Sequence, residues 1–139
     1  MTAETKAEAL EVLASHFSEV FAVDRQSVHE GLLEREALGS TGFGRGLAIP
    51  HARLEELRRP VAVLLRLETP CDFSAADGMP VDLVFGLLSP VNAGATHLHA
   101  LAAISRLVRD DDMHRQMSEA PDSDALYALI TNAVDRDAA

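Results

Sequence analysis

Apolar side chains recur every three or four positions near the start of the chain, over residues 5 to 22. They are Ala9, Leu10, Leu13, Phe17 and Val20, a spacing that gathers them on one face of a helix. Asp24 then has the chemistry of an N-cap. The sequence therefore predicts a second helix that continues from Asp24 through Val28, Leu32 and Leu33.

The hydrophobic pattern changes in the middle of the chain. Leu47-Ala48-Ile49 is a short strand candidate that Pro50 ends. VAVLLRL follows Pro60 and ends at residues 68–70, and PVDLVFGLL covers residues 80–88. Runs that are almost continuously apolar are typical of strands buried on both faces. The intervening CDFSAADG is predicted to be a turn with Asp77-Gly78 at its tip.

Helical spacing returns in the last third. Residues 96–109, THLHALAAISRLVR, carry Leu101, Ile104, Leu107 and Val108 on one side. A short helix with Met113 and Met117 is expected after residues 110–112, and a last helix after residues 121–123. Helices followed by strands and then helices predict an α/β fold with a sheet covered on both faces. With no linker or repeat in 139 residues, we expect one domain over residues 1–139.

Charge and cysteine content exclude several classes of protein. The formal net charge is −10, from 22 acidic and 12 basic residues, so no nucleic-acid partner is expected. The apolar runs are too short for membrane insertion. Cys71 is the only cysteine, so no internal disulfide can form, and the N-terminus has no apolar signal segment. These features favour a cytoplasmic protein.

Half of the chain's 8 glycines lie within GSTGFGRGLAIPHA, residues 39–52. Glycine lets a ligand approach the backbone closely, and successive N–H groups in such loops bind anions. We therefore predict that Gly42 and the hydroxyls of Ser40 and Thr41 bind phosphate. Arg35, on the preceding helix, has the planar fork that suits a phosphate group.

His51 directly follows a proline, which stiffens the chain before it. A neutral imidazole can act as a nucleophile through the nitrogen that carries no proton. His51 beside a phosphate-binding loop is therefore a candidate phosphoryl acceptor. The alternative is a glycine-rich loop that only turns a corner, with His51 as an ordinary polar residue.

His97 is the second candidate, because positions 97, 101, 104 and 108 share the apolar face of their helix. A helix N-terminus disfavours imidazolium. A neutral His97 would donate to a phosphoryl oxygen or hold His51 in its tautomer; the alternative is a half-buried histidine bonded to backbone. His99 points elsewhere, and no histidine pattern matches a zinc motif, so neither a metal nor a cofactor is expected.

LEREALGSTGFGRGLAIPHA resembles the active-site signature of type-2 enzyme IIA domains of the bacterial phosphoenolpyruvate-dependent phosphotransferase system, the fructose/mannitol class. Within it, the nitrogen-regulatory IIA-Ntr branch is the most similar. The likeness continues through LETPCDFSAADGMPVDLVFGLLSP, THLHALAAISRLVRDDD and SDALYALI. It covers nearly the whole chain from Lys6 onward. The strand and short helix that family members carry before this point are expected to be absent.

The resemblance implies a three-layer α/β/α sandwich with a mixed β-sheet. It also implies that His51 accepts the phosphoryl group, that His97 is the second active-site histidine, and that Arg35, Ser40 and Thr41 lie around the phosphate. The implied activity is that of a phosphotransferase component with a phosphohistidine intermediate. Its implied donor is a small histidine-containing phosphocarrier protein.

Three functions remain open at this stage. The first is a phosphoryl relay used for regulation, in which phosphorylation changes the target proteins bound. The second is a sugar-specific IIA component that passes the group to a IIB domain. The third is a non-catalytic interaction module of the same fold, although such modules lack the active histidine.

Overall fold

The computed structural model describes residues 5–75, 77–92 and 95–121. It forms two compact units, residues 1–97 and 98–139. The last predicted helix lies outside the described residues. Among the described helices, none has the length and apolar character needed to cross a bilayer.

Two helices open the first unit, as the apolar spacing predicted. Helix α1 is Lys6–Phe21, and the side chain of its N-cap, Thr5, accepts a hydrogen bond from the Glu8 amide at 3.2 Å. Helix α2 is Arg25–Leu38, and the carboxylate of Asp24 accepts from the Ser27 amide at 3.0 Å. The N-cap predicted at Asp24 is thus confirmed, because a short side-chain acceptor satisfies an amide that has no partner within the helix.

The sheet is built around one long strand, β5 (Val81–Pro90). Strands β2 (Leu47–Ala48) and β3 (His51–Leu54) pair with it in parallel, and β4 (Val61–Cys71) pairs with it antiparallel. Strand β1 (Gly42–Gly44) adds to β2 in antiparallel orientation. The expected α/β class and the mixed sheet are therefore confirmed.

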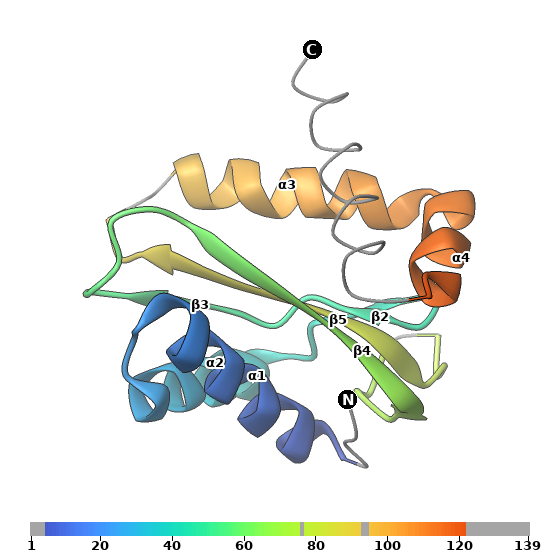
Figure 1. Ribbon diagram of the computed structural model, residues 1–139, viewed down its shortest axis with the longest axis horizontal. Helices are drawn as coiled ribbons and strands as arrows, with labels where there is room; N and C mark the ends of the chain where they lie inside the picture. The colour runs from blue at the N-terminus through green and yellow to red at the C-terminus, as the bar shows by residue number, and fades with distance from the viewer. Residues whose placement is uncertain (1–4, 76, 93–94, 122–139) are drawn as a thin grey trace. The chain divides into compact units, whose positions relative to one another are not determined.

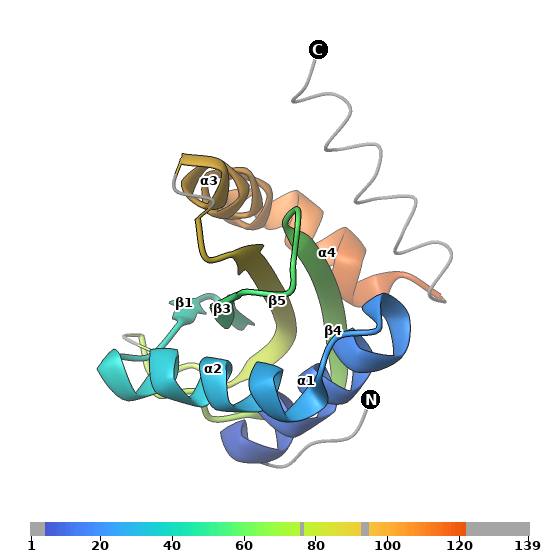
Figure 2. The same ribbon diagram turned by 90° about the vertical axis from the view of Figure 1, so that its left-hand side faces the viewer.

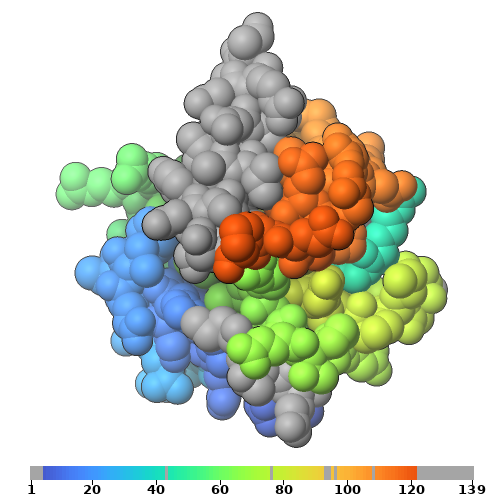
Figure 3. Space-filling view, turned by 45° about the vertical axis from the view of Figure 1, so that its right-hand side comes forward, coloured from blue at the N-terminus to red at the C-terminus, as the bar shows by residue number. Residues whose placement is uncertain are grey.

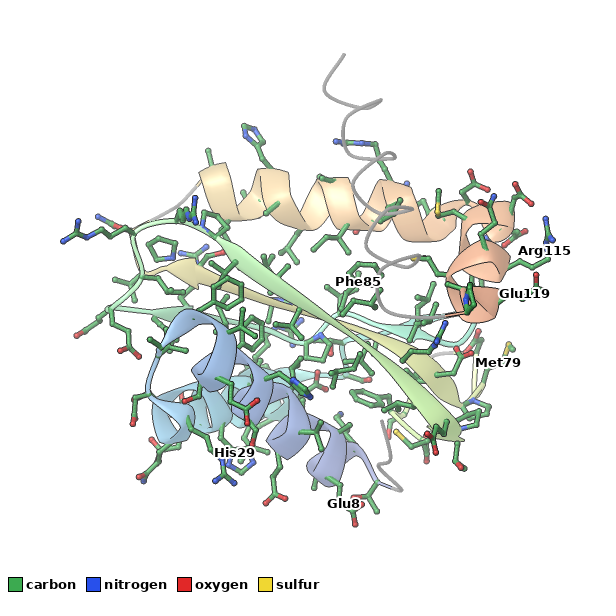
Figure 4. All side chains as sticks on the ribbon, in the orientation of Figure 1. Glu8, His29, Met79, Phe85, Arg115 and Glu119 are labelled. Atoms are coloured by element: carbon green, nitrogen blue, oxygen red, sulfur yellow. The ribbon has the colours of Figure 1, made fainter. Side chains whose placement is uncertain are left out.

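Helices α1 and α2 lie side by side on one face of this sheet (Figures 1 and 2). Val84 and Leu88 of β5 belong to the core that these helices help to bury. Between them, Gly86 leaves room for α1, because a Cβ there would stand 2.6 Å from Cδ1 of Leu13. Phe85 alternates with these residues and points away from α1 and α2 (Figure 4).

Two strand predictions need correction. Strand β4 was expected to end at residues 68–70, but it continues to Cys71, with an irregular register between Arg66 and Cys71. Residues 61–67 were also expected to be buried on both faces, yet Ala62 is exposed and Val63, Leu64 and Arg66 are only half-buried. Among the described strands β4 pairs only with β5, so it is an edge strand that faces solvent along part of its length.

The turn predicted after β4 is confirmed, because the Gly78 amide donates to the Ala75 carbonyl at 3.0 Å. The end of this turn, near Met79, lies on the surface (Figures 3 and 4).

Helix α3 (Ala95–Arg109) begins in the first unit and continues into the second. Helix α4 (Asp111–Glu119) follows, with the Asp110 carboxylate accepting from the amides of Asp112 and Met113. Met113 and Met117 are its buried residues, and Arg115 pairs with Glu119 one turn away at 3.7 Å (Figure 4). Both helices were predicted at these places.

Candidate functional site

His51 is the first residue of β3, directly after Pro50. The strand is short and was not predicted, because its polar–apolar alternation covers only four residues, too few to indicate a strand. Pairing with β5 forms it: His51 aligns with Leu87, and the Leu87 amide donates to the Pro50 carbonyl at 3.0 Å. The backbone of the histidine is therefore held by the central strand while its side chain is only partly buried.

Two contacts determine which nitrogen of His51 carries the proton. Nδ1 lies 2.8 Å from the carbonyl oxygen of Ile49, which can only accept. Nε of Arg35 donates to Nε2 at 3.2 Å, and a guanidinium can only donate. Both contacts require the proton on Nδ1, so Nε2 presents its lone pair.

Arg35 reaches His51 from the last turn of α2. Its Nη1 donates to the carbonyl oxygen of Gly39 at 2.8 Å, just after the helix ends. A cation at this position also suits the negative end of the helix dipole. Nη1 is thereby anchored to the chain, which holds Nε in place to donate to Nε2 of His51.

His97 lies beside His51, with ring centroids 5.6 Å apart and ring planes inclined at 49°. Only 4% of His97 is exposed. Its Nδ1 is 2.6 Å from Oγ of Ser89, a fully buried residue near the end of β5. The second candidate is thus bonded to a side chain rather than to backbone, and the structure brings His51, His97 and Arg35 together.

Burial is the largest cause of a lowered pKa at both histidines. At His51, the charges of Arg35 and Arg53 also lower the pKa, while the Ile49 carbonyl and Glu36 raise it in part. At His97, the charges of Arg53 and His51 add to the effect of burial in lowering the pKa. Both rings are therefore neutral at neutral pH, the form in which a ring nitrogen is nucleophilic.

We expect the ring titrations of His51 and His97, followed by NMR, to have midpoints below the ordinary histidine value of about 6.5. The folded protein then binds fewer protons than the unfolded chain below that pH. These rings leave the free energy of unfolding unchanged above about pH 6.5, and they reduce it as the pH falls from there toward the folded-state values. Denaturant unfolding should show that the free energy of unfolding falls less in His51→Gln than in the wild-type protein between about pH 6.5 and pH 5.5. A midpoint at or above about 6.5 for His51 contradicts the expectation.

Ser40 and Thr41 lie on the loop that joins α2 to β1, and Gly42 is the first residue of β1. Their polar groups bond to nearby protein atoms. The Ser40 hydroxyl donates to the Phe73 carbonyl and accepts from the Gly42 amide. The hydroxyl and amide of Thr41 both donate to the Glu36 carboxylate. These contacts shape the loop, and the phosphate-binding role of the three residues stays a prediction.

The same Glu36 carboxylate connects the loop to the start of α1. Its side chain is 5% exposed and lies 2.6 Å from Nζ of Lys6. A buried carboxylate of this kind needs its cation and its hydrogen bonds to offset desolvation. Glu36 therefore holds together α1, the end of α2 and the loop that precedes the candidate acceptor.

Sequence reasoning missed two of the groups that touch the histidines. The Ile49 carbonyl is a backbone atom, and only the bend at Pro50 brings it back to the ring two residues later. Ser89 is the other, and no local pattern marks it. Its place follows from the parallel register, which sets Ser89 opposite Arg53, two residues beyond His51. Among the described residues, no group of three or more histidine, cysteine or acidic side chains is placed to hold a metal ion.

An α/β protein with a neutral, cation-flanked histidine at the edge of a mixed sheet has the features of a protein that carries a phosphoryl group on an imidazole. Comparison with known families agrees with this class. The model of the family described as phosphoenolpyruvate-dependent sugar phosphotransferase system, EIIA 2, matches residues 1–133. The chain belongs to this family and is a phosphoryl-relay component of the phosphotransferase system.

Individual relatives agree with this assignment. The chain is 44% identical over 126 residues to the nitrogen regulatory protein of Bradyrhizobium diazoefficiens, covering 91% of this chain and 82% of that one. It is 41% identical over 130 residues to the nitrogen regulatory protein of Escherichia coli K12, covering 93% and 80% of the two chains. The crystal structure of IIA-Ntr from Neisseria meningitidis superposes with a TM-score of 0.88 at 30% identity, covering 94% of this chain and 89% of that one.

Proposed function

We propose that His51 accepts a phosphoryl group from a histidine-containing phosphocarrier protein, and that the chain uses this modification chiefly for regulation. One observation carries the proposal. The Ile49 carbonyl and the Arg35 guanidinium both require the Nδ1–H tautomer of His51, so the Nε2 lone pair is directed to a cation. That is the state an imidazole needs to attack phosphorus.

The transfer needs no proton to leave His51. The Nε2 lone pair forms the new P–N bond while the P–N bond of the donor phosphohistidine breaks, and the donor nitrogen keeps that bonding pair. The proton on Nδ1 stays bonded to the Ile49 carbonyl throughout. The rate of such a step depends mainly on positioning of the two imidazoles and on stabilisation of the phosphoryl oxygens.

Cations near His51 supply that stabilisation in a chain whose net charge is −10. Arg35 donates a hydrogen bond to Nε2 of His51, and Arg53 is close enough for its charge to lower the pKa of both histidines. The same charges favour two negative charges on a phosphoryl group attached to His51. We propose that Arg35 moves its hydrogen bond from Nε2 to a phosphoryl oxygen.

The regulatory branch is favoured over sugar transfer by the degree of similarity. Identity to the nitrogen regulatory proteins of Bradyrhizobium diazoefficiens, Klebsiella oxytoca, Shigella flexneri and Escherichia coli is 41% or 44% over at least 126 residues. Identity to the fructose-specific EIIABC component of Bacillus subtilis is 38% over 107 residues. The solved complex of enzyme IIA mannitol with a phosphorylated IIB protein is similar at 19% identity and a TM-score of 0.78, which bears on the fold alone. The sugar-specific role, with a IIB domain as acceptor, remains the second candidate, and the proposed setting is the cytoplasm.

Incubation with phosphoenolpyruvate, enzyme I and the phosphocarrier protein should add one phosphoryl group that acid removes and alkali does not. A pull-down should then compare phosphorylated and unphosphorylated protein. Target proteins held by one form only support regulation, whereas transfer of the label to a IIB domain supports the sugar-specific role. An acid-stable adduct, or no adduct with an active donor, contradicts the proposal.

A further inference from the structure

Ser89 is a fully buried polar residue to which neither the fold nor the proposed transfer has assigned a role. It lies on β5, on the face of the sheet that points away from α1 and α2, because it alternates with the core residue Leu88. Parallel pairing sets it beside Arg53, and its Oγ is 2.6 Å from Nδ1 of His97. A short contact between two buried side chains determines where the proton of the histidine lies.

Two arrangements of that contact are possible when His97 is neutral. In the first, the Ser89 hydroxyl donates to Nδ1, and the ring proton is on Nε2. In the second, Nδ1–H donates to Oγ, and the hydroxyl proton needs another acceptor. Among the described residues, the only side-chain hydrogen-bond partner of Ser89 is His97. The second arrangement would leave a buried donor unpaired, which is costly, so the first is favoured.

The charges around His97 also favour the neutral ring that this argument needs. Burial, Arg53 and His51 all lower its pKa. No acidic side chain is among the groups that shift the pKa of His97. A neutral ring with its proton on Nε2 is a hydrogen-bond donor on the side opposite Ser89, in a ring whose centroid is 5.6 Å from that of His51.

We infer that Ser89 is a positioning residue that sets the tautomer of His97: its hydroxyl donates to Nδ1, so the ring proton lies on Nε2 and is available to a phosphoryl oxygen at His51. The two histidines are thereby held in opposite tautomers. His51 carries its proton on Nδ1 and offers a lone pair, while His97 carries its proton on Nε2 and offers a donor. This inference rests on the proposed function only for the phosphoryl oxygen, since the tautomer itself belongs to the unmodified protein.

The tautomer is tested in the unphosphorylated protein by two-bond ¹H–¹⁵N NMR correlation of the histidine rings. The expected result is an Nε2–H pattern for His97 and an Nδ1–H pattern for His51. Ser89→Ala should convert His97 to a mixture of tautomers or to Nδ1–H, and Ser89→Thr, which keeps the hydroxyl, should restore the wild-type pattern. A proton on Nδ1 of His97 in the wild-type protein, or an unchanged pattern in Ser89→Ala, would overturn the inference.

Phosphoryl transfer gives a second readout. Ser89→Ala should lower kcat about tenfold, with KM for the phosphocarrier protein unchanged, because one neutral hydrogen bond in the transition state is misdirected. The same substitution should have no further effect on kcat in His97→Ala, since Ser89 acts through that ring. Equal losses in both backgrounds would overturn the role of Ser89 in transfer. If the wild-type protein accepts no phosphoryl group, the proposed function fails, while the NMR patterns still decide the tautomer.

Discussion

Replacing His51 with alanine should abolish phosphorylation completely. The expected acceptor is a single atom, Nε2, of a ring whose Nδ1 contacts the Ile49 carbonyl and whose Nε2 accepts from Arg35. The neighbouring imidazole of His97 cannot replace it, because Nδ1 of His97 is bonded to Ser89 and Nε2 carries the proton, so neither nitrogen offers a free lone pair. The measurement is incorporation of label from phosphoenolpyruvate through enzyme I and the phosphocarrier protein, with intact mass as a second readout.

The matched control for this variant is His99→Ala. His99 is an exposed histidine on α3, two residues after His97. Replacing it removes one histidine from the chain, as His51→Ala does. It should leave both the rate and the final level of label unchanged. Labelling of His51→Ala at the wild-type level, or its loss in His99→Ala, would place the acceptor elsewhere in the chain.

Replacing Arg35 with alanine should slow phosphoryl transfer by about 10²-fold in kcat, the usual effect of removing one preorganised donor to a developing anion. Arg35→Lys should recover part of that loss, because lysine restores the charge without the planar fork. The result is measured as single-turnover transfer from the phosphorylated carrier protein, so that binding and chemistry are separated.

Arg25→Ala is the control for Arg35, since it removes the same charge from the other end of the same helix, where the side chain is exposed. It should transfer at the wild-type rate. Arg35 also bonds to the Gly39 carbonyl, so each variant should be checked by denaturant unfolding at the temperature of the assay. A folded Arg35→Ala protein with wild-type kcat would remove Arg35 from the mechanism.

The two candidate histidines differ in how far their environments could be predicted. The signature around His51 indicated an acceptor beside an arginine, and in the structure Arg35 donates a hydrogen bond to Nε2 of His51. For His97, helical spacing predicted an inward side chain and left its partner open between a phosphoryl oxygen, His51 and the backbone. The partner in the structure is Ser89, eight residues earlier in the chain and on a different element. Helical periodicity places a residue on a face, but it does not say what the sheet presents to that face.

The glycine-rich stretch shows a second limit. Its composition predicted a loop with free donors for an anion, yet the structure forms β1 from part of it and bonds its hydroxyls to Glu36 and Phe73. Strands as short as β1 and β3 depend on their pairing partners more than on their own side chains, whereas the predicted strand at Leu47-Ala48-Ile49 is found as β2. The length of such a segment is too small for an alternating pattern to be read from the sequence.

The sequence by itself determined the helices, the two long strands and the family, because these depend on local spacing, on capping residues and on a contiguous signature. Only the tertiary structure decided the protonation pattern of the two histidines. That pattern depends on a carbonyl brought back by a bend at Pro50, on a guanidinium reaching across from α2, and on a hydroxyl positioned by parallel strand pairing. Each of these is a contact between elements, and its geometry is set by packing rather than by the order of residues along the chain.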